Sequence, residues 1–280
     1  KQVDNMVDNI NNWNDYLDGF ADNFEFELQS EVQSTIERWQ SEGLLDDIIG
    51  SALNTELDVV KTELEDKINT LSIFMDDYIR YEGEADDTGR FRRAVADAES
   101  EGKTIFISGR YTISDTIELR NRVSIQGQSQ SQTIIEFNGD GVAFYFLDDV
   151  NNSDNGFGYG CYYNNLSNFT LITKDYPHLN NEATAFSGEP RYSYFLNVTV
   201  RGFDILFDWS NNWTNKYVNC IFAYNRVWYR SGAQNNAVNF VNCSFGGGEY
   251  GFAMRSCYGM NFSGCNLETA SIALFLPTHA

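Results

Sequence analysis

Hydrophobic and polar positions alternate in a repeating pattern along residues 193–276. In each repeat an aromatic residue stands two positions before an asparagine or glycine, and further apolar residues follow. The repeat is registered on Asn197, Asn219, Asn242 and Gly264, which are 22, 23 and 22 residues apart. Asn168 fits the same register one longer step earlier. A period of this length with short β-rich segments predicts a solenoid, in which each repeat is one turn of a parallel β-helix.

Residues 1–81 carry a different pattern, with an apolar residue at about every third or fourth position. A first stripe comprises Val3, Met6, Ile10, Trp13, Leu17, Phe20, Phe24, Leu28, Val32, Ile36 and Trp39. Residues 41–43 interrupt it, and a second stripe comprises Leu44, Ile48, Leu53, Leu57, Val60, Leu64, Ile68, Leu71, Met75 and Tyr78. The narrow seam favours a coiled coil, although a globular helical hairpin would give the same stripes. Such helices cannot bury their seam alone, so the pattern indicates an oligomer.

A short helix is expected between these stripes and the β-rich part. Residues 82–89 form a polar link, and Asp87 or Thr88 is placed to cap a helix over 90–101 that ends at Gly102. Strands are expected over 104–107, 111–114, 116–119, 123–127 and 133–137. The polar excursions at 148–160 and 174–191 are expected to be loops. We therefore divide the chain into a helical region at 1–81, a link with a helix at 82–103, and a β-helix at 104–280.

Within the β-helix we expect two short strands in each coil from residue 193 onward, for example 195–200 followed by 205–207. Residues one repeat apart then stack about 4.8 Å apart. The corner asparagines would form an internal amide ladder, which is a structural feature rather than a catalytic one. Cys220, Cys243 and Cys265 share one position of the repeat, as small hydrophobic residues in a core ladder would.

The opening of the β-rich part carries a resemblance to a known family. Asp86-Asp-Thr-Gly-Arg-Phe-Arg-Arg-Ala-Val-Ala-Asp-Ala is followed by Gly102-Lys-Thr-Ile-Phe-Ile-Ser-Gly-Arg-Tyr-Thr-Ile, Val123-Ser-Ile-Gln-Gly and Thr133-Ile-Ile-Glu-Phe. This succession resembles pectate-lyase-like right-handed parallel β-helix proteins, in which a capping helix closes the N-terminal end of the solenoid. The resemblance covers about residues 85–276, and Ser108-Gly-Arg stands where the family usually has a proline.

The combination of a β-helix with an N-terminal coiled coil is similar to viral tailspikes, tail fibres and appendages. In those proteins the N-terminal part attaches to the particle, and the β-helix binds or cleaves surface polysaccharide. The resemblance implies a homotrimer. It also implies that residues 1–81 contact other proteins of the virion tail or baseplate.

Composition and charge narrow the partners further. The formal net charge is −21, and no basic stripe is available to neutralise phosphates, which argues against nucleic acid. The acidic surface fits ordinary solubility or a high-salt environment. No run approaches 18 apolar residues, so no membrane insertion is expected. The five cysteines have no zinc spacing and do not indicate a disulfide framework, and we expect neither a metal nor a cofactor.

Candidate catalytic residues are carboxylates, because the sequence offers no Ser-His-Asp set and only two histidines. Asp204 and Glu249 lie at the same offset, seven residues after Asn197 and Asn242. Two coils separate them, or roughly 10 Å, which is near the upper limit for an inverting acid and base. Glu268 lies in the next coil. The alternative interpretation is that all three are solvated turn carboxylates.

Candidate glycan-binding residues are aromatic, because flat rings stack on sugar faces. They are Trp209, Trp213, Tyr217 and Trp228, which fall near one side of two coils. The alternative is that they pack in the core or at a subunit interface. The sequence thus favours a tail fibre or tailspike component of a virion that recognises host-surface glycan. The alternatives are a glycoside hydrolase or polysaccharide lyase of the same fold, and a purely structural virion component.

Overall fold

The computed structural model describes residues 30–38, 57–65, 67, 72–147, 160–174, 176, 182–268 and 272–275. The chain divides into two compact units, Lys1–Lys67 and Ile68–Ala280. In the first unit, residues 30–38 and 57–65 are helical, as the apolar stripes predict there. Most other positions of the two stripes lie outside the described residues, as do 148–159, 175 and 177–181 of the expected loops. The expectation of a loop was wrong at the end of 174–191, where residues 184–188 and 190–191 are strands. Among the helices that the structure describes, none has both the length and the apolar character needed to cross a bilayer.

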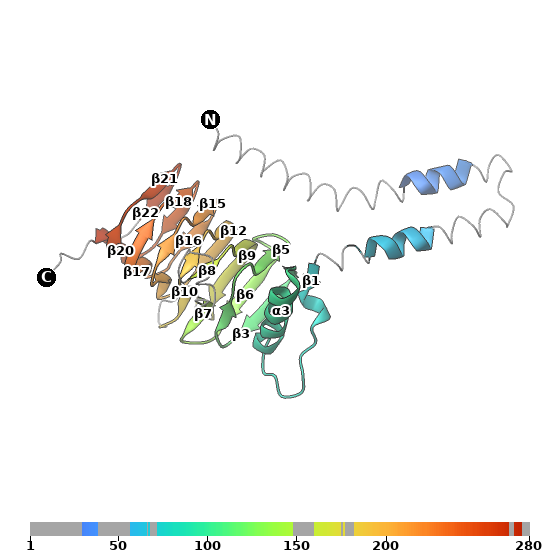
Figure 1. Ribbon diagram of the computed structural model, residues 1–280, viewed down its shortest axis with the longest axis horizontal. Helices are drawn as coiled ribbons and strands as arrows, with labels where there is room; N and C mark the ends of the chain where they lie inside the picture. The colour runs from blue at the N-terminus through green and yellow to red at the C-terminus, as the bar shows by residue number, and fades with distance from the viewer. Residues whose placement is uncertain are drawn as a thin grey trace. The chain divides into compact units, whose positions relative to one another are not determined.

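The second unit is a stack of parallel strands that confirms the predicted parallel β-helix (Figure 1). Over the described residues, the strands form one sheet of 13 and one of 10. Successive coils pair in register, so that Phe195 lies beside Tyr217 and Tyr217 beside Phe240. The strands outline three faces rather than the two strands per coil that we expected. The reason is that the chain bends inside the segments that we read as single strands.

The first face comprises β1 (Ser72–Phe74), β2 (Thr104–Ile107), β5 (Ser124–Gly127), the first halves of β9 (Asn165–Thr173) and β12 (Tyr194–Arg201), β15 (Lys216–Val218), β18 (Val238–Val241) and β21 (Met260–Ser263). The second face comprises β3 (Arg110–Ile113), β6 (Ile134–Phe137), the second halves of β9 and β12, β16 (Ile221–Ala223), β19 (Ser244–Gly246) and β22 (Asn266–Glu268). The third face comprises β4 (Ile117–Leu119), β7 (Val142–Phe146), β10 (Thr184–Gly188), β13 (Ile205–Trp209), β17 (Val227–Asn236), β20 (Tyr250–Cys257) and β23 (Ile272–Phe275). Three short strands extend it beside the end of β17, namely β8 (Cys161–Tyr162), β11 (Pro190–Arg191) and β14 (Asn212–Trp213).

The chain turns between faces at residues with a left-handed backbone. The corner between the first and second faces consists of Asn168, Asn197, Asn219, Asn242 and Gly264. The corner between the second and third faces contains Gly202, Tyr224 and Gly247. The corner between the third and first faces contains Tyr163, Tyr192, Thr214 and Ala237. Asparagine and glycine adopt this conformation at little cost, which explains why they mark the repeat in the sequence.

The asparagine column is half-buried over most of its length and forms the expected amide ladder only in part. Asn168, Asn197 and Asn219 are half-buried, and Asn242 is exposed. One ladder bond is present, in which Asn197 Nδ2 donates to Asn168 Oδ1 at 3.0 Å.

The interior is filled by stacked rings and aliphatic side chains. The aromatic residue two positions before each corner points inward, and ring centroids along the column Phe195, Tyr217, Phe240 and Phe262 are 4.7, 4.5 and 5.2 Å apart. Cys220 and Cys243 are buried in the core and Cys265 is half-buried, which confirms the cysteine column. Their thiols are free, and each donates to a carbonyl oxygen of the preceding coil.

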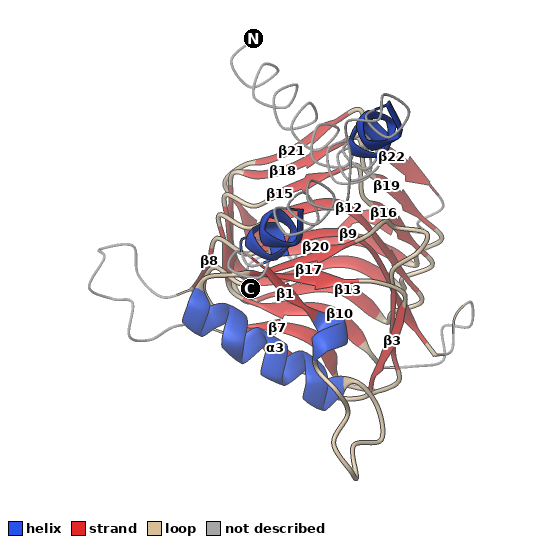
Figure 2. Cartoon of the chain, turned by 90° about the vertical axis from the view of Figure 1, so that its right-hand side faces the viewer, coloured by secondary structure: helices blue, strands red, loops and turns tan. Residues whose placement is uncertain are grey.

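A helix closes the N-terminal end of the stack, as the sequence predicted. α3 (Thr88–Glu101) lies across the end of the stack and packs on β1, β2 and β4 (Figure 2). Its buried side chains are Thr88, Phe91, Ala94, Val95 and Ala98. It ends at Gly102, whose φ of 68° satisfies the left-handed position that follows a helix.

Residues 72–74 form a strand, so the predicted helical continuation of the second stripe was wrong there. β1 pairs with β2, with Ser72 opposite Thr104 and Phe74 opposite Phe106. A short 3-10 helix, η1 (Met75–Asp77), follows. Ile73 and Met75 are buried. Their spacing suits a strand as well as a helix, and pairing with the edge of β2 satisfies the backbone in the extended form.

Candidate functional site

An exposed group of tyrosines lies at the corner between the third and first faces. We define the tyrosine cluster as Tyr162, Tyr163 and Tyr192. The rings of Tyr163 and Tyr192 are stacked, with centroids 5.5 Å apart and planes 25° apart. Tyr163 is 51% exposed and Tyr192 is 39% exposed, whereas Tyr162 is buried beneath them with its centroid 6.2 Å from that of Tyr192. The cluster offers flat apolar rings and phenol hydroxyls to the solvent.

The tyrosine cluster rests on an arginine held between two rings. The Arg191 guanidinium lies 5.7 Å from the Tyr162 ring centroid and 5.1 Å from that of Trp213. Glu189 balances its charge at 3.8 Å. Cation–π contacts of this kind fix the rings in place, so the outer rings are held by a rigid base.

The backbone under the two exposed tyrosines is strained. Tyr163 has φ of 60° and Tyr192 has φ of 52°, in the left-handed region that disfavours bulky side chains. A residue held there costs roughly 1–3 kcal/mol, which glycine or asparagine would avoid. The next two coils place Thr214 and Ala237 at the same corner with φ of 56° and 53°, so the left-handed conformation belongs to the corner and its occupant varies. The turn does not require tyrosine, and the two stacked, exposed rings on adjacent coils are therefore the candidate binding surface.

The four aromatic residues that we predicted from the sequence are placed differently. Trp209, Tyr217 and Trp228 are buried in the core, with exposed fractions of 1%, 0% and 0%. They have no free ring face for a sugar, so the glycan-binding prediction is wrong for these three and the packing alternative holds. Trp213 is half-buried and packs on Arg191, next to the tyrosine cluster.

The predicted carboxylates Asp204 and Glu249 stand in one column at the entry to the third face. The strand residues that follow them are in register through Val227, so two coils do separate them. Arg226 stands between them. It donates through Nε and Nη2 to both oxygens of Asp204, the second bond being 3.0 Å long, and its Nη1 lies 3.7 Å from Glu249. The hydrogen bonds to Asp204 raise the pKa of the Arg226 guanidinium.

This arrangement is an ion-pair ladder rather than an open acid–base pair. An inverting pair needs space for a water and a sugar between its carboxyl groups. Here the guanidinium of Arg226 fills that space. A second arginine–aspartate pair joins the same two coils, since Arg230 donates to both oxygens of Asp208 at 2.7 and 2.5 Å.

Glu268 lies on a different face from the other two carboxylates. It belongs to β22, where it stacks beside Gly246, and it accepts a hydrogen bond from Asn266 at 2.6 Å. Its side chain is exposed. Over the residues that the structure describes, no group of three His, Cys, Asp or Glu side chains is arranged to hold a metal ion.

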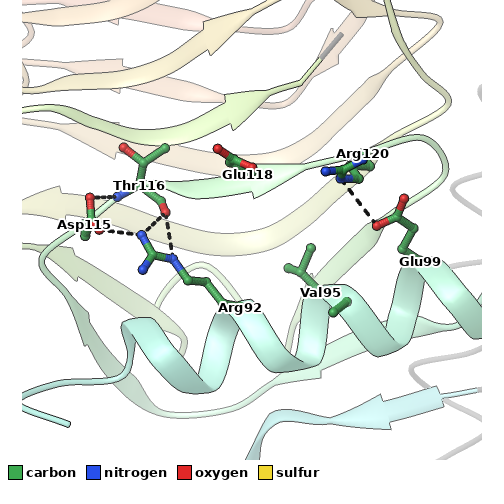
Figure 3. A pocket seen from close by; sticks show the side chains of 8 residues that line it. Arg92, Val95, Glu99, Asp115, Thr116, Glu118 and Arg120 are labelled. Atoms are coloured by element: carbon green, nitrogen blue, oxygen red, sulfur yellow. Dashed lines mark hydrogen bonds and ion pairs between the residues drawn. The ribbon is translucent and has the colours of Figure 1, made fainter. Parts of the chain in front are cut away.

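A groove with a volume of about 640 Å³ lies between α3 and β4 (Figure 3). It is lined by Arg92, Val95, Ala96, Glu99, Asp115, Thr116, Glu118 and Arg120. Arg92 donates to Asp115 at 2.5 Å and to the Thr116 carbonyl at 2.9 Å, and Arg120 lies 3.7 Å from Glu99. These ion pairs connect the capping helix to the first coil, so the charged groups of the groove already have a structural role.

Sequence reasoning missed the tyrosine cluster. Tyr192, Thr214 and Ala237 are spaced by 22 and 23 residues, the same period that identified the asparagine column. A second register drawn through these positions would have placed Tyr192 at a corner, and therefore outside the core. The longer step back to Tyr163 matches the longer step from Asn197 to Asn168.

Comparison with known proteins places the fold. No family model and no curated protein sequence matches the chain. Among solved structures it is similar to ORF18 of Geobacillus virus E2, with 15% identity and a TM-score of 0.53 over 79% of this chain and 45% of that one. The A-module of mannuronan C-5 epimerase AlgE6 from Azotobacter vinelandii matches 69% of this chain and 57% of its own, with 16% identity and a TM-score of 0.48. The chain thus spans about half the length of these proteins, and the similarity concerns the fold alone.

Proposed function

We propose that this chain is part of a virion tail fibre or tailspike, in which the β-helix binds a glycan on the host surface. The observation that carries the proposal is the tyrosine cluster, with two exposed rings held at strained corners. Aromatic rings bury large area at low entropy cost and present a hydroxyl at the edge, which suits the alternating apolar and polar surface of a sugar. The likeness in fold to a viral protein supports the virion assignment.

The arrangement of the candidate carboxylates favours binding of the glycan without its cleavage. Asp204 and Glu249 are engaged by Arg226, and Glu268 lies on another face. The Arg226 guanidinium stands between Asp204 and Glu249, where an inverting mechanism needs space for a water and the sugar. We therefore keep the degradative enzyme as the alternative that the test below distinguishes.

The test compares the full-length protein with Tyr163→Ala/Tyr192→Ala on a panel of immobilised bacterial lipopolysaccharides and capsular polysaccharides. The wild type is expected to bind at least one member, and the double variant to bind it about tenfold more weakly, because two stacking faces are lost. Tyr258→Ala is the matched control, since Tyr258 is 70% exposed but lies away from the cluster. Equal binding by wild type and the double variant would contradict the role of the cluster.

Sizing the bound polysaccharide after incubation separates adhesion from degradation. We expect its length to be unchanged. Shortened chains would favour the enzyme, and loss of the shortening in Asp204→Asn or Glu249→Gln would locate its site. Absence of binding to every member of a panel that includes the natural host would favour the purely structural component.

The helical region completes the proposal. Residues 1–81 are proposed to assemble three copies and to attach them to another protein of the virion tail. The mass of the assembly in solution tests whether three copies associate.

A further inference from the structure

Arg201 differs from other arginines of the solenoid in lacking an acidic partner among the residues that the structure describes. It ends β12, at the corner between the second and third faces. Its Nε is buried and has no hydrogen-bond partner, and no carboxylate in the described part of the chain forms an ion pair with it. Three other arginines of the solenoid, Arg191, Arg226 and Arg230, each pair with an acidic residue. A buried unpaired donor is costly, so its retention calls for a reason.

Two tyrosine rings stand beside this arginine. The Arg201 guanidinium lies 6.0 Å from the ring centroid of Tyr176, and the Tyr176 and Tyr224 rings meet edge to face at 5.9 Å. Tyr224 is 49% exposed and has φ of 57°, so it is a third exposed tyrosine at a strained corner. We define the arginine corner as Arg201, Tyr176 and Tyr224.

Glycines at the same corner make room for the rings. A Cβ on Gly247 would come within 2.9 Å of the Tyr224 ring, and a Cβ on Gly202 would lie 3.1 Å from the Cβ of Tyr176. Both glycines have positive φ. Gly202 and Gly247 therefore leave the space in which the Tyr176 and Tyr224 rings lie, next to the Arg201 guanidinium.

We propose that the arginine corner binds the carboxylate of an acidic saccharide, with Tyr224 packing against its sugar ring. The guanidinium is planar and presents paired N–H donors in a geometry that matches a carboxylate. Nearby Asp204 pairs with Arg226, so it does not take up the charge of Arg201. This inference rests on the proposed function, which makes the ligand a glycan. The arginine corner adds that the glycan contains a uronic acid or a similar sugar acid.

The experiment uses full-length protein and uronate-containing bacterial polysaccharides, each paired with its carboxyl-reduced, neutral derivative. We expect the wild type to prefer the acidic form, and Arg201→Gln to lose that preference, with about tenfold to a hundredfold weaker binding of the acidic form. Binding of the reduced form should change little. Arg201→Lys keeps the charge but not the planar pair of donors, so it should recover part of the preference. Arg255→Gln is the control, because Arg255 is an exposed arginine with no such surroundings.

A second readout tests whether Arg201 is merely structural. Without ligand, Arg201→Gln should unfold at a temperature equal to or above that of the wild type, because the variant removes a buried unpaired donor. A clear fall in its unfolding temperature, relative to Arg255→Gln, would overturn the proposal. So would equal binding of acidic and reduced forms by the wild type, or an unchanged preference in Arg201→Gln. Failure to bind any polysaccharide, acidic or neutral, would instead contradict the proposed function itself.

Discussion

At the scale of single residues, the left-handed corners of this solenoid are occupied both by asparagines and by exposed tyrosines. Asn197 and Asn219 occupy left-handed positions at which an L-residue with a short polar side chain is tolerated. Tyr163, Tyr192 and Tyr224 occupy equivalent positions with a bulky ring, and all three rings are exposed. Thr214 and Ala237 have the same left-handed backbone, so the functional argument rests on the exposure and stacking of the tyrosine rings rather than on strain alone.

The residue-scale prediction concerns the asparagine column. Asn219→Val is expected to lower the free energy of unfolding by roughly 1–3 kcal/mol, because a β-branched residue is poorly accommodated at a φ of 53°. Asn219→Gly should be nearly neutral, because glycine adopts the same conformation freely. Chemical denaturation of the two variants measures the difference. Similar losses in both would show that the amide group of Asn219, rather than its backbone, stabilises the corner.

At the scale of elements, the capping helix is held by a buried carboxylate. Asp87 accepts hydrogen bonds from Arg80 at 3.0 and 2.9 Å, from Arg90 at 2.7 Å and from the Thr112 N–H at 2.9 Å. It therefore joins the segment before α3, the helix itself and β3. Burial acts to raise the pKa of Asp87, but the hydrogen bonds from Arg80, Thr112 and Arg90 outweigh it and lower the pKa below its usual value.

At this scale we predict that the protein loses stability in acid, because Asp87 holds the capping helix. Because the pKa of Asp87 is lowered in the folded state, its contribution is fully present above the unfolded value of about 3.9 and is lost as the pH falls through the folded value. The unfolding temperature should thus be steady near neutral pH and fall below about pH 4. Asp115, whose pKa is lowered by Arg92, adds to the same trend.

Asp87→Asn isolates this contribution. At pH 7 it should lower the free energy of unfolding by about 3 kcal/mol, because Arg80 and Arg90 lose their counter-charge. The gap between variant and wild type should narrow below pH 4, where Asp87 becomes protonated in the wild type as well. Glu82→Gln, an exposed carboxylate of the same segment, is the control and should show no such gap. A gap for Asp87→Asn that is independent of pH would mean that packing, not charge, explains the loss.

At the scale of the whole molecule, the sequence predicts the fold better than the site. The period of Asn197, Asn219 and Asn242 reports backbone conformation directly, because few residue types tolerate a left-handed corner. It therefore predicted the coils and their register. Side-chain direction is a weaker signal. In β13, Phe207 and Trp209 are buried and Asp208 between them is more exposed. Which of the alternating side chains face the core depends on the register of the strand with the neighbouring coils.

The same limit explains the misjudged carboxylates. Arg226 lies seven residues after Asn219, the same offset that placed Asp204 and Glu249 in one column. The three therefore stack as acid, base and acid, and pair with one another. The cap was predictable because Phe91, Val95 and Ala98 follow a helical period, whereas β1 was not, because its pairing with β2 is a tertiary contact.

The final prediction concerns assembly of the helical unit. In the helix at 57–65, Leu57, Val60 and Leu64 follow a spacing of three and four residues that puts them along one side, and they are 44%, 45% and 38% exposed. An apolar stripe of this kind is the seam of a coiled coil, and it needs partner helices to be buried. We expect light scattering to give a mass about three times the 31.9 kDa of one chain.

The variant Leu57→Glu/Leu64→Glu should reduce that mass to the monomer, because charges in the seam oppose association. Val59→Glu is the matched control, since Val59 is 52% exposed but lies on the opposite side of the same helix. A wild-type monomer would contradict the trimer, and a dimer would keep the coiled coil while correcting its order. If the seam variant became monomeric yet still bound glycan through the tyrosine cluster, the helices would serve assembly alone. Loss of avidity without loss of the single-site affinity is the expected result, because three linked β-helices bind a repeating polymer more tightly than one.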